Sequence, residues 1–204
     1  KYGYTISNLN NPSFFDILNK VIKIYDVKLI IDIGANIGQF SKKILSLDYK
    51  EKIILIEPIR ATFIELENQL KGNNSEKNKN LLLNNIALST QTSKMKMYKV
   101  NRNNGKGDMN SFFKTNENST KLIKNSNVIS HEYVDAVDIN EFFSNIVIEE
   151  NTLIKIDTEG HDFELLKHLD KKYFQKVLGF IIEIHYVPFF ENKYTDPLEI
   201  TNFF

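Results

Sequence analysis

Apolar residues recur along the chain in two alternating patterns. Short runs rich in isoleucine and leucine are typical of strands that are buried on both faces of a parallel sheet. Between these runs, apolar residues recur every three or four positions, as they do on the buried side of a helix. The runs of the first kind occupy residues 28–34, 52–58, 81–88, 152–157 and 179–186.

The helical spacing first occurs at residues 13–25, where it predicts an amphipathic helix that buries Phe14, Leu18, Val21 and Tyr25. The later stripes are Phe40, Ile44 and Leu47, then Ile59, Phe63, Leu66 and Leu70, and finally Phe163, Leu166 and Leu169. Strands that alternate with helices predict parallel pairing through right-handed crossovers. The expected fold class is therefore α/β, with a mostly parallel, twisted sheet and helices on both faces.

The middle of the chain departs from this order. Residues 93–100 and 131–138 alternate between apolar and polar positions, which predicts two half-exposed strands in a hairpin or at a sheet edge. The segment between them, residues 101–127, is long, polar and contains glycine. We interpret it either as a flexible segment over a binding site or as a disordered one.

The amino-acid composition limits the classes of function that this chain can have. The chain has 204 residues, enough for one domain with a full core, and we expect a helical lead-in over residues 1–28 and the main domain over residues 29–204. Lysine plus arginine and aspartate plus glutamate both number 26, so net charge gives no support for nucleic acid or an anionic membrane as a partner. No apolar run reaches the roughly 18 residues of a membrane helix, and we expect no signal peptide before the first strand.

The chain has no cysteine. This excludes a disulfide scaffold, a thiolate nucleophile and a zinc–thiolate site. The absence fits a reducing compartment, so we expect a cytoplasmic protein.

Acidic and amide residues follow several of the predicted strands. These residues are Asp32, Glu57, Asn85, Asp157 and Glu183. In an open parallel sheet, ligands bind beyond the carboxyl ends of the strands, at the point where the strand order reverses. Each residue has a separate explanation as a cap or turn residue, but together they indicate a binding crevice.

The turn after the first strand carries Gly34, Asn36 and Gly38. Glycine allows close approach to the backbone, and asparagine tolerates a left-handed conformation. Backbone N–H groups at the start of the next helix would hold a carboxylate or a phosphate. Gln39 occupies the third glycine position of the dinucleotide fingerprint, so a smaller nucleoside is favoured. A tight turn without any ligand is the alternative.

Glu57 closes the second strand, where a carboxylate would accept two hydrogen bonds from a ribose diol. The alternative is a cap for the following helix. Asn85, Ile86 and Ala87 end the third strand, where an adenine would lie, although Ile86 and Ala87 suit the core equally well.

The second informative stretch is residues 154–169, in which a buried strand ends at Asp157 and is followed by Glu159 and His161. Two carboxylates and an imidazole within five residues suit general base catalysis or a cationic ligand, and helix capping explains the same residues. His185 would lie at the mouth of the same crevice, with a purely structural role as the alternative.

Several stretches resemble, in this order, the FkbM family of S-adenosylmethionine-dependent methyltransferases. They are IIDIGANIGQFSKKIL, ILIEPIRATFIELENQL, NNIALS, AVDINEFF, LIKIDTEGHDFELLKHL and IIEIH, and they extend over roughly residues 29–186. The resemblance implies a Rossmann-like class I methyltransferase fold and S-adenosylmethionine as cosubstrate. It also implies methyl transfer to an oxygen, often a hydroxyl of a sugar, glycan or secondary metabolite.

Matching the motifs residue by residue implies a cosubstrate site. Its members would be Asp32, Gly34, Ala35, Asn36, Gly38, Phe40, Glu57, Pro58, Asn85, Ile86 and Ala87, with Ser111 from the segment DMNSFF. The resemblance places Asp157 near the transferred methyl group. The fold normally ends with an antiparallel strand pair after the fifth strand, and no such pair is found before Phe204.

Methyl transfer to a hydroxyl also requires a group that takes the proton, and the candidates are Asp157, Glu159 and His185. No metal is required by this chemistry, and the sequence does not establish three converging ligands for Mg²⁺ near Asp157.

Two other functions use a similar fold, namely a nicotinamide-dependent oxidoreductase and a non-catalytic nucleoside-binding module. The oxidoreductase is disfavoured by the missing third glycine and by the lack of an evident hydride-transfer set. The expected partner is a small-molecule or glycan acceptor, without nucleic acid or membrane. A homo-oligomer is compatible with the sequence.

Overall fold

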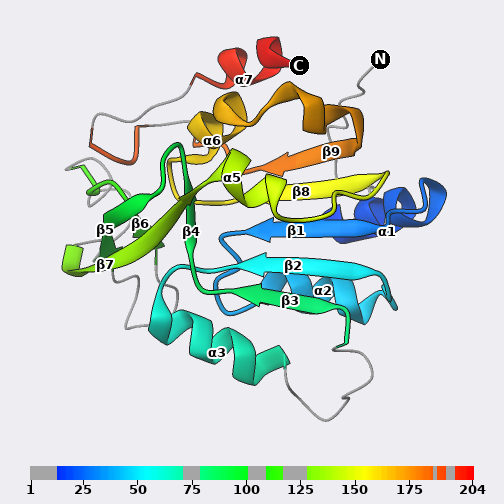
Figure 1. Cartoon of the computed structure of the whole chain (residues 1–204), viewed down its shortest axis with the longest axis horizontal. Helices are drawn as coiled ribbons and strands as arrows, with labels where there is room; N and C mark the ends of the chain where they lie inside the picture. The colour runs from blue at the N-terminus through cyan, green and yellow to red at the C-terminus, as the bar shows by residue number, and fades with distance from the viewer. Residues whose placement is uncertain (1–12, 71–78, 101–108, 117–127, 186–187, 192–195) are drawn as a thin grey trace.

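The computed structural model describes residues 13–70, 79–100, 109–116, 128–185, 188–191 and 196–204. The described residues form two sheets (Figure 1). The first sheet has five parallel strands in the order β3-β2-β1-β8-β9. Its strands are β1 (Leu29–Ile33), β2 (Lys52–Ile56), β3 (Leu81–Asn84), β8 (Thr152–Ile156) and β9 (Val177–Ile182).

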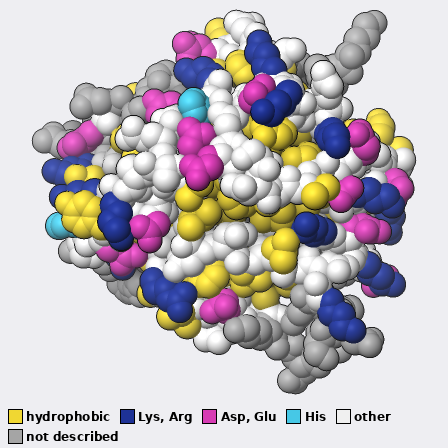
Figure 2. Space-filling view, in the orientation of Figure 1, with side chains coloured by type: hydrophobic (Ala, Val, Ile, Leu, Met, Phe, Trp, Pro, Cys, Tyr) yellow, Lys and Arg dark blue, Asp and Glu magenta, His cyan; other side chains and the backbone are white. Residues whose placement is uncertain are grey.

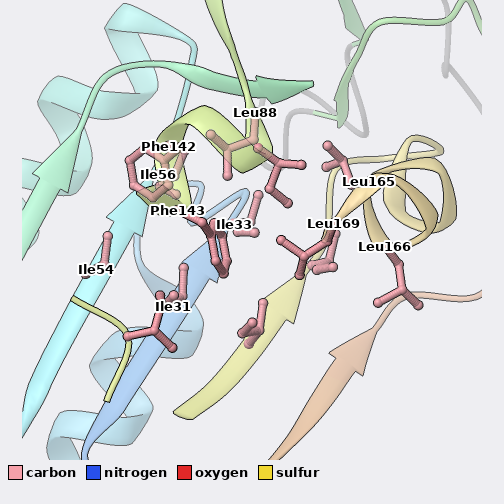
Figure 3. Close-up of a cluster of buried hydrophobic side chains, with 14 of the residues drawn as sticks. Ile31, Ile33, Ile54, Ile56, Leu88, Phe142, Phe143, Leu165, Leu166 and Leu169 are labelled. Carbon is pink, nitrogen blue, oxygen red and sulfur yellow. The ribbon is translucent and has the colours of Figure 1, made fainter. Parts of the chain in front are cut away.

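Helices cover both faces of this parallel sheet. They are α1 (Phe14–Ile24), α2 (Gln39–Ser46), α3 (Arg60–Leu70), α5 (Ile139–Ser144), α6 (Asp162–His168) and α7 (Pro197–Phe203), with a 3₁₀ helix η1 (Lys171–Gln175). Successive strand residues point to opposite faces. Ile31 and Ile33 of β1 therefore pack with the side chains of α5 and α6 (Figure 3), whereas Ile30 packs with those of α1, α2 and α3. The expected α/β class with a covered parallel sheet is confirmed.

The second sheet has the order β4-β7-β5-β6. Its strands are β4 (Ala87–Ser89), β5 (Ser93–Val100), β6 (Met109–Ser111) and β7 (Val128–Asp138). The pairing of β5 with β7 is antiparallel, which confirms the two half-exposed strands predicted from alternation. Met97 and Val134 belong to the core cluster of this sheet.

The prediction of one continuous strand over residues 81–88 is wrong. The stretch divides between the two sheets, because β3 ends at Asn84 and β4 begins at Ala87. The side-chain amide of Asn85 donates hydrogen bonds to the backbone oxygens of Glu57 and Pro58, at 2.9 and 3.0 Å. These hydrogen bonds fix the break between the two strands.

The stripes predicted for α3 and for α6 are buried as expected. In α1 the predicted face is wrong at Phe14 and Tyr25, which are both about half exposed. The buried residues are Leu18 and Ile22, and the ring of Phe15 lies against Phe40 of α2, with ring centroids 6.0 Å apart. The helix is thus rotated so that Phe15 rather than Phe14 faces the domain, and the described part of the lead-in packs into the same core as β1.

The fifth strand is shorter than predicted and only half-buried, because β9 ends at Ile182 and lies at the edge of its sheet. Tyr186 and most of segment 101–127 lie outside the described residues. Among the residues described after β9 there is α7 and a single bridge between Thr115 and Phe190, but no antiparallel strand pair.

Basic and acidic side chains are interspersed on the face of the molecule shown in Figure 2. Within the part of the chain that the structure describes, none of the helices has the length and apolar character needed to cross a bilayer.

Candidate active site

The strand order reverses between β1 and β8. From β1 the chain continues outward through β2 and β3, and it later returns to the other side of β1 to form β8 and β9. The residues that follow the two central strands are Gly34 and Asp157, and the N–H of Asp157 donates to the oxygen of Ile33 at 3.0 Å. This reversal is the place where open parallel sheets bind ligands.

An open cleft lies at this reversal, with about 630 Å³ of space including the part that opens to solvent. Its lining comes from both sheets: Ile33, Gly34, Asn36, Ile56, Glu57, Pro58, Ala87, Leu88, Met97, Asn110, Phe112, Asp157, Thr158 and Glu159. Apolar side chains with a few convergent polar groups are typical of a small-molecule site.

The glycines of the first turn are required by the packing of the protein itself. Gly34 has φ of 80°, and a Cβ there would lie 1.9 Å from the backbone oxygen of Asp157. Gly38 has φ of 86°, and a Cβ there would lie 2.7 Å from a methyl group of Leu66 in α3. The backbone of Gly34 also borders the cleft, so this glycine serves both the fold and the site.

A hydrogen bond joins Asn36 to Glu57, and both residues line the cleft. Asn36 has a left-handed backbone with φ of 49°, and its N–H donates to one carboxylate oxygen of Glu57 at 3.0 Å. The other oxygen accepts from the N–H of Ile59 at 2.9 Å. Burial raises the pKa of Glu57 to about 7, although both hydrogen bonds favour the ionised form. Because a carboxylate has about four acceptor positions, Glu57 retains positions for a ligand.

The third strand end contributes less to the cleft than the sequence predicted. The side chain of Asn85 is used to hold the backbone of Glu57 and Pro58, and it is not part of the cleft lining. Ile86 packs against the core cluster behind the sheet. Ala87 and Pro58 do line the cleft.

Asp32 lies beneath the first turn rather than at its surface. Its side chain is fully buried, accepts a hydrogen bond from the hydroxyl of Ser41 at 2.7 Å, and lies 3.3 Å from the ammonium of Lys155. The same ammonium lies 2.9 Å from a carboxylate oxygen of Asp157 and 5.7 Å from the ring centre of Phe40. Lys155 therefore connects the buried carboxylate to the one at the cleft.

Lys155 is not among the site residues predicted from the sequence. Burial disfavours its charged form, but the carboxylates of Asp32 and Asp157 outweigh this effect and raise the pKa of Lys155 above its ordinary value. Asp32 and Lys155 are direct partners in the register of β1 and β8. Each of these two buried strands contains one charged residue, and the two charges have opposite signs. This pattern in the sequence could have identified the pair.

The loop between β8 and α6 is held by its own polar groups. The buried carboxylate of Asp162 accepts hydrogen bonds from the N–H groups of Thr158 and Gly160, at 2.7 and 3.0 Å. Burial raises the pKa of Asp162 to about 6, against the effect of these hydrogen bonds. The hydroxyl of Ser111 donates to the backbone oxygen of Glu159 at 2.6 Å. Ser111 thus attaches the second sheet to this loop and lies behind the cleft lining.

His161 is part of the packing under this loop. Its ring is buried, with Nδ1 2.9 Å from a carboxylate oxygen of Glu164 and Nε2 3.5 Å from the hydroxyl of Ser89. The ring of Phe112 meets it edge to face, at 5.6 Å between centroids. His161 therefore supports Phe112, which lines the cleft.

Comparison with known proteins assigns the family. A model of the methyltransferase FkbM domain matches residues 32–204, which is most of the chain. The chain belongs to the FkbM methyltransferase family. No curated protein matches the chain.

The structure is similar to the crystal structure, at 2.20 Å resolution, of methyltransferase FkbM from Methylobacillus flagellatus KT. The TM-score is 0.54 at 17% sequence identity, over 87% of this chain. This chain spans 36% of the length of that protein. The similarity shows that the two proteins share a fold, which is the Rossmann-like fold expected from the sequence.

In this FkbM family member the residues expected at the site divide into two groups. Those that line the cleft are Gly34, Asn36, Glu57, Pro58, Ala87, Asp157 and Glu159. Those outside the lining are Asp32, Ala35, Gly38, Phe40, Asn85, Ile86, Ser111 and His185. Lining residues that the sequence did not indicate include Met97 and Asn110 of the second sheet and Phe112, which directly follows β6. Only the fold brings that sheet to the strand ends.

His185 lies next to the cleft residue Glu159 rather than in the cleft lining. Its Nε2 is 3.9 Å from a carboxylate oxygen of Glu159 and 3.6 Å from one of Glu183. The ring of Phe189 stacks on it at 5.7 Å between centroids. The three candidate catalytic groups therefore do not form one hydrogen-bonded set: Asp157 is paired with Lys155, and Glu159 lies beside His185.

Proposed function

We propose that this FkbM family member is an S-adenosylmethionine-dependent O-methyltransferase that acts on a hydroxyl group of a small molecule or glycan. The observation that carries the proposal is the cleft at the reversal of strand order, which combines Glu57 with the carboxylates of Asp157 and Glu159. The family membership supports methyl transfer, and the local chemistry supports an oxygen acceptor.

We infer that the cleft would hold a nucleoside with an amino acid attached. Glu57 offers acceptors for the ribose hydroxyls, while Ala87, Leu88 and Met97 give an apolar wall against which a purine would pack. The backbone of Gly34 would lie against the methionine part. S-adenosylmethionine supplies, when bound, a methyl group that is already activated by its attachment to a sulfonium.

The protein must then align the acceptor hydroxyl, exclude water and accept a proton. Asp157 is suited to the proton because its side chain is 36% exposed and lines the cleft. The ammonium of Lys155, with its side chain 12% exposed, holds the Asp157 carboxylate from behind. Phe112 and Met97 would shield this region from water.

Calorimetric titration tests the cosubstrate. S-adenosylhomocysteine should bind with one site per chain, whereas NAD should not bind. Binding of NAD without binding of S-adenosylhomocysteine would support the oxidoreductase alternative and overturn the proposal.

Substitution tests the chemistry. Asp157→Asn should slow methyl transfer in a screen of hydroxyl acceptors by about 10²–10⁴-fold, the usual contribution of a general base, while changing the affinity for S-adenosylhomocysteine much less. Cosubstrate binding without turnover on any acceptor would support a non-catalytic nucleoside-binding module instead.

A further inference from the structure

A cluster of three metal-ligating side chains lies beside the cleft. Glu159, Glu183 and His185 each contribute one ligand atom, and these atoms all lie within 4.8 Å of one another. We propose that this cluster binds a divalent cation at the rim of the cleft. The cation site stands on this geometry alone, whereas its role in catalysis rests on the function proposed above.

The separations within the cluster fit a shared cation. Nε2 of His185 lies 3.9 Å from Oε2 of Glu159 and 3.6 Å from Oε2 of Glu183. Both distances exceed the roughly 2.7–3.2 Å of a hydrogen bond. Donors that each lie about 2.1 Å from one ion are about 3 Å apart at a right angle and about 4.2 Å apart on opposite sides. The observed distances fall between these two values.

Aromatic packing holds the imidazole of His185 in place. Phe189 stacks on its ring at 5.7 Å and 25°, and Phe190 meets it edge to face at 5.6 Å and 82°. Phe190 in turn packs against Gly160, where a Cβ would lie 2.6 Å from its ring. The orientation of a ligating imidazole is normally fixed by neighbours of this kind.

The two carboxylates come from neighbouring strand ends. Glu183 directly follows β9, and its N–H donates to the oxygen of Ile156 at 3.3 Å. The backbone oxygen of Glu159 is held by the hydroxyl of Ser111. The imidazole of His185 lies within 4 Å of both carboxylates, and a cation shared by the three groups would attract both negative charges.

The ligand set selects the class of ion. One imidazole nitrogen and two carboxylate oxygens suit a first-row divalent ion such as Mn²⁺, which accepts both donor types. The side chain of Glu183 is 43% exposed and that of His185 is 24% exposed, so the remaining coordination positions face solvent. Those positions would be available to water or to an oxygen of the acceptor.

Glu159 also lines the cleft, so a cation held by the cluster would lie next to an acceptor bound in the cleft. The acceptor hydroxyl would coordinate the cation through its oxygen and lose its proton to Asp157. The oxygen would then form a bond to the methyl carbon as the carbon–sulfur bond breaks, and the electron pair of that bond would stay on sulfur. The products would be a methyl ether, S-adenosylhomocysteine and the released proton.

The test is a titration of the full chain with Mn²⁺. Binding is measured by electron paramagnetic resonance, as the loss of the signal of the free ion. The wild type should bind one ion per chain. Glu183→Gln and His185→Gln should each weaken the affinity by at least about tenfold. Glu150→Gln changes an exposed carboxylate outside the cluster and should leave Mn²⁺ affinity unchanged.

Calorimetry with S-adenosylhomocysteine on the same proteins separates the two proposals. Wild-type protein that binds S-adenosylhomocysteine but gives no saturable Mn²⁺ binding overturns the cation site and leaves the proposed function intact. The same holds if the cluster variants bind Mn²⁺ as well as Glu150→Gln does. Mn²⁺ binding without S-adenosylhomocysteine binding overturns the proposed function and leaves the cation site standing. Matching thermal unfolding of the variants shows that any loss is local.

Discussion

Gly34 directly follows β1, and a side chain at this position would point at the backbone of Asp157, which directly follows the neighbouring strand β8. The sequence predicted that a ligand approaches the backbone closely at this position, which stays a prediction. The structure shows that the protein's own chain approaches there. A one-dimensional pattern specifies that a residue must be small, but it does not specify which neighbour requires it.

Gly34→Ala should therefore destabilise the fold and not only the site. The new Cβ would meet a backbone oxygen at 1.9 Å while φ stays in the left-handed region, so we expect a loss on the order of 3 kcal/mol in the free energy of unfolding. Urea denaturation measures this loss. Gly179→Ala is the matched control, because its Cβ would meet the nearest atom at an ordinary 3.7 Å. Equal stability of the two variants would contradict the packing role of Gly34.

Glu57 should make cosubstrate binding depend on pH. Its pKa is raised to about 7 by burial, so below that pH the carboxyl is mostly protonated and accepts fewer hydrogen bonds. Ribose hydroxyls donate to the ionised form, so the affinity for S-adenosylhomocysteine should rise by up to about tenfold between about pH 6 and pH 8. Calorimetry across this range measures the effect. Glu57→Gln should give weaker binding and a flatter profile, and an unchanged profile would argue against the ribose contact.

Among the strands, β1 and β8 are joined by a side-chain ion pair in addition to their backbone hydrogen bonds. Asp32 and Lys155 are direct partners in register, and the ammonium reaches on to Asp157 at the cleft. The hydrophobic pattern predicted both strands and their parallel direction, because their isoleucines must be covered on both faces. It did not predict that they are adjacent, since β2, β3 and the whole second sheet separate them along the chain.

Lys155→Met should cost about 3–5 kcal/mol of unfolding free energy, because it leaves the fully buried carboxylate of Asp32 without its cation. The double variant Asp32→Asn with Lys155→Met should lose less than the sum of the two single changes. Lys94→Met, which removes an exposed ion pair with Asp135, should cost no more than about 1 kcal/mol. Urea denaturation of the wild type, the two single variants of the pair, the double variant and Lys94→Met measures these losses, and strict additivity of the buried pair would contradict the coupling.

At the scale of the whole molecule, the cleft belongs to two sheets. Gly34, Glu57 and Asp157 come from the ends of the parallel sheet, while Met97 and Phe112 come from the second sheet or directly follow it. The hydroxyl of Ser111 attaches the second sheet to the β8–α6 loop. A ligand in the cleft would therefore contact both sheets.

Binding should accordingly stabilise the molecule as a unit. At a concentration one hundred times its Kd, S-adenosylhomocysteine should add about 2.7 kcal/mol and raise the Tm by about 5–10 °C. Differential scanning calorimetry measures the shift as a single transition, and NAD at the same concentration should give none. Separate transitions of which only one moves would show that the ligand contacts a single sheet.

The periodic elements and the residues at the strand ends follow from the sequence alone. Apolar spacing specifies strands and helices, and Gly34, Glu57 and Asp157 follow directly on predicted strands, so a crevice could be predicted without coordinates. The tertiary structure decided which residues meet there. It placed Asp32 in a buried ion pair with Lys155, brought Phe112 over the cleft and set His185 beside Glu159 and Glu183. Apart from the contact between Glu183 and His185, these contacts join positions far apart in the chain, and no local spacing encodes them because they arise only when the strands take their order in the sheet.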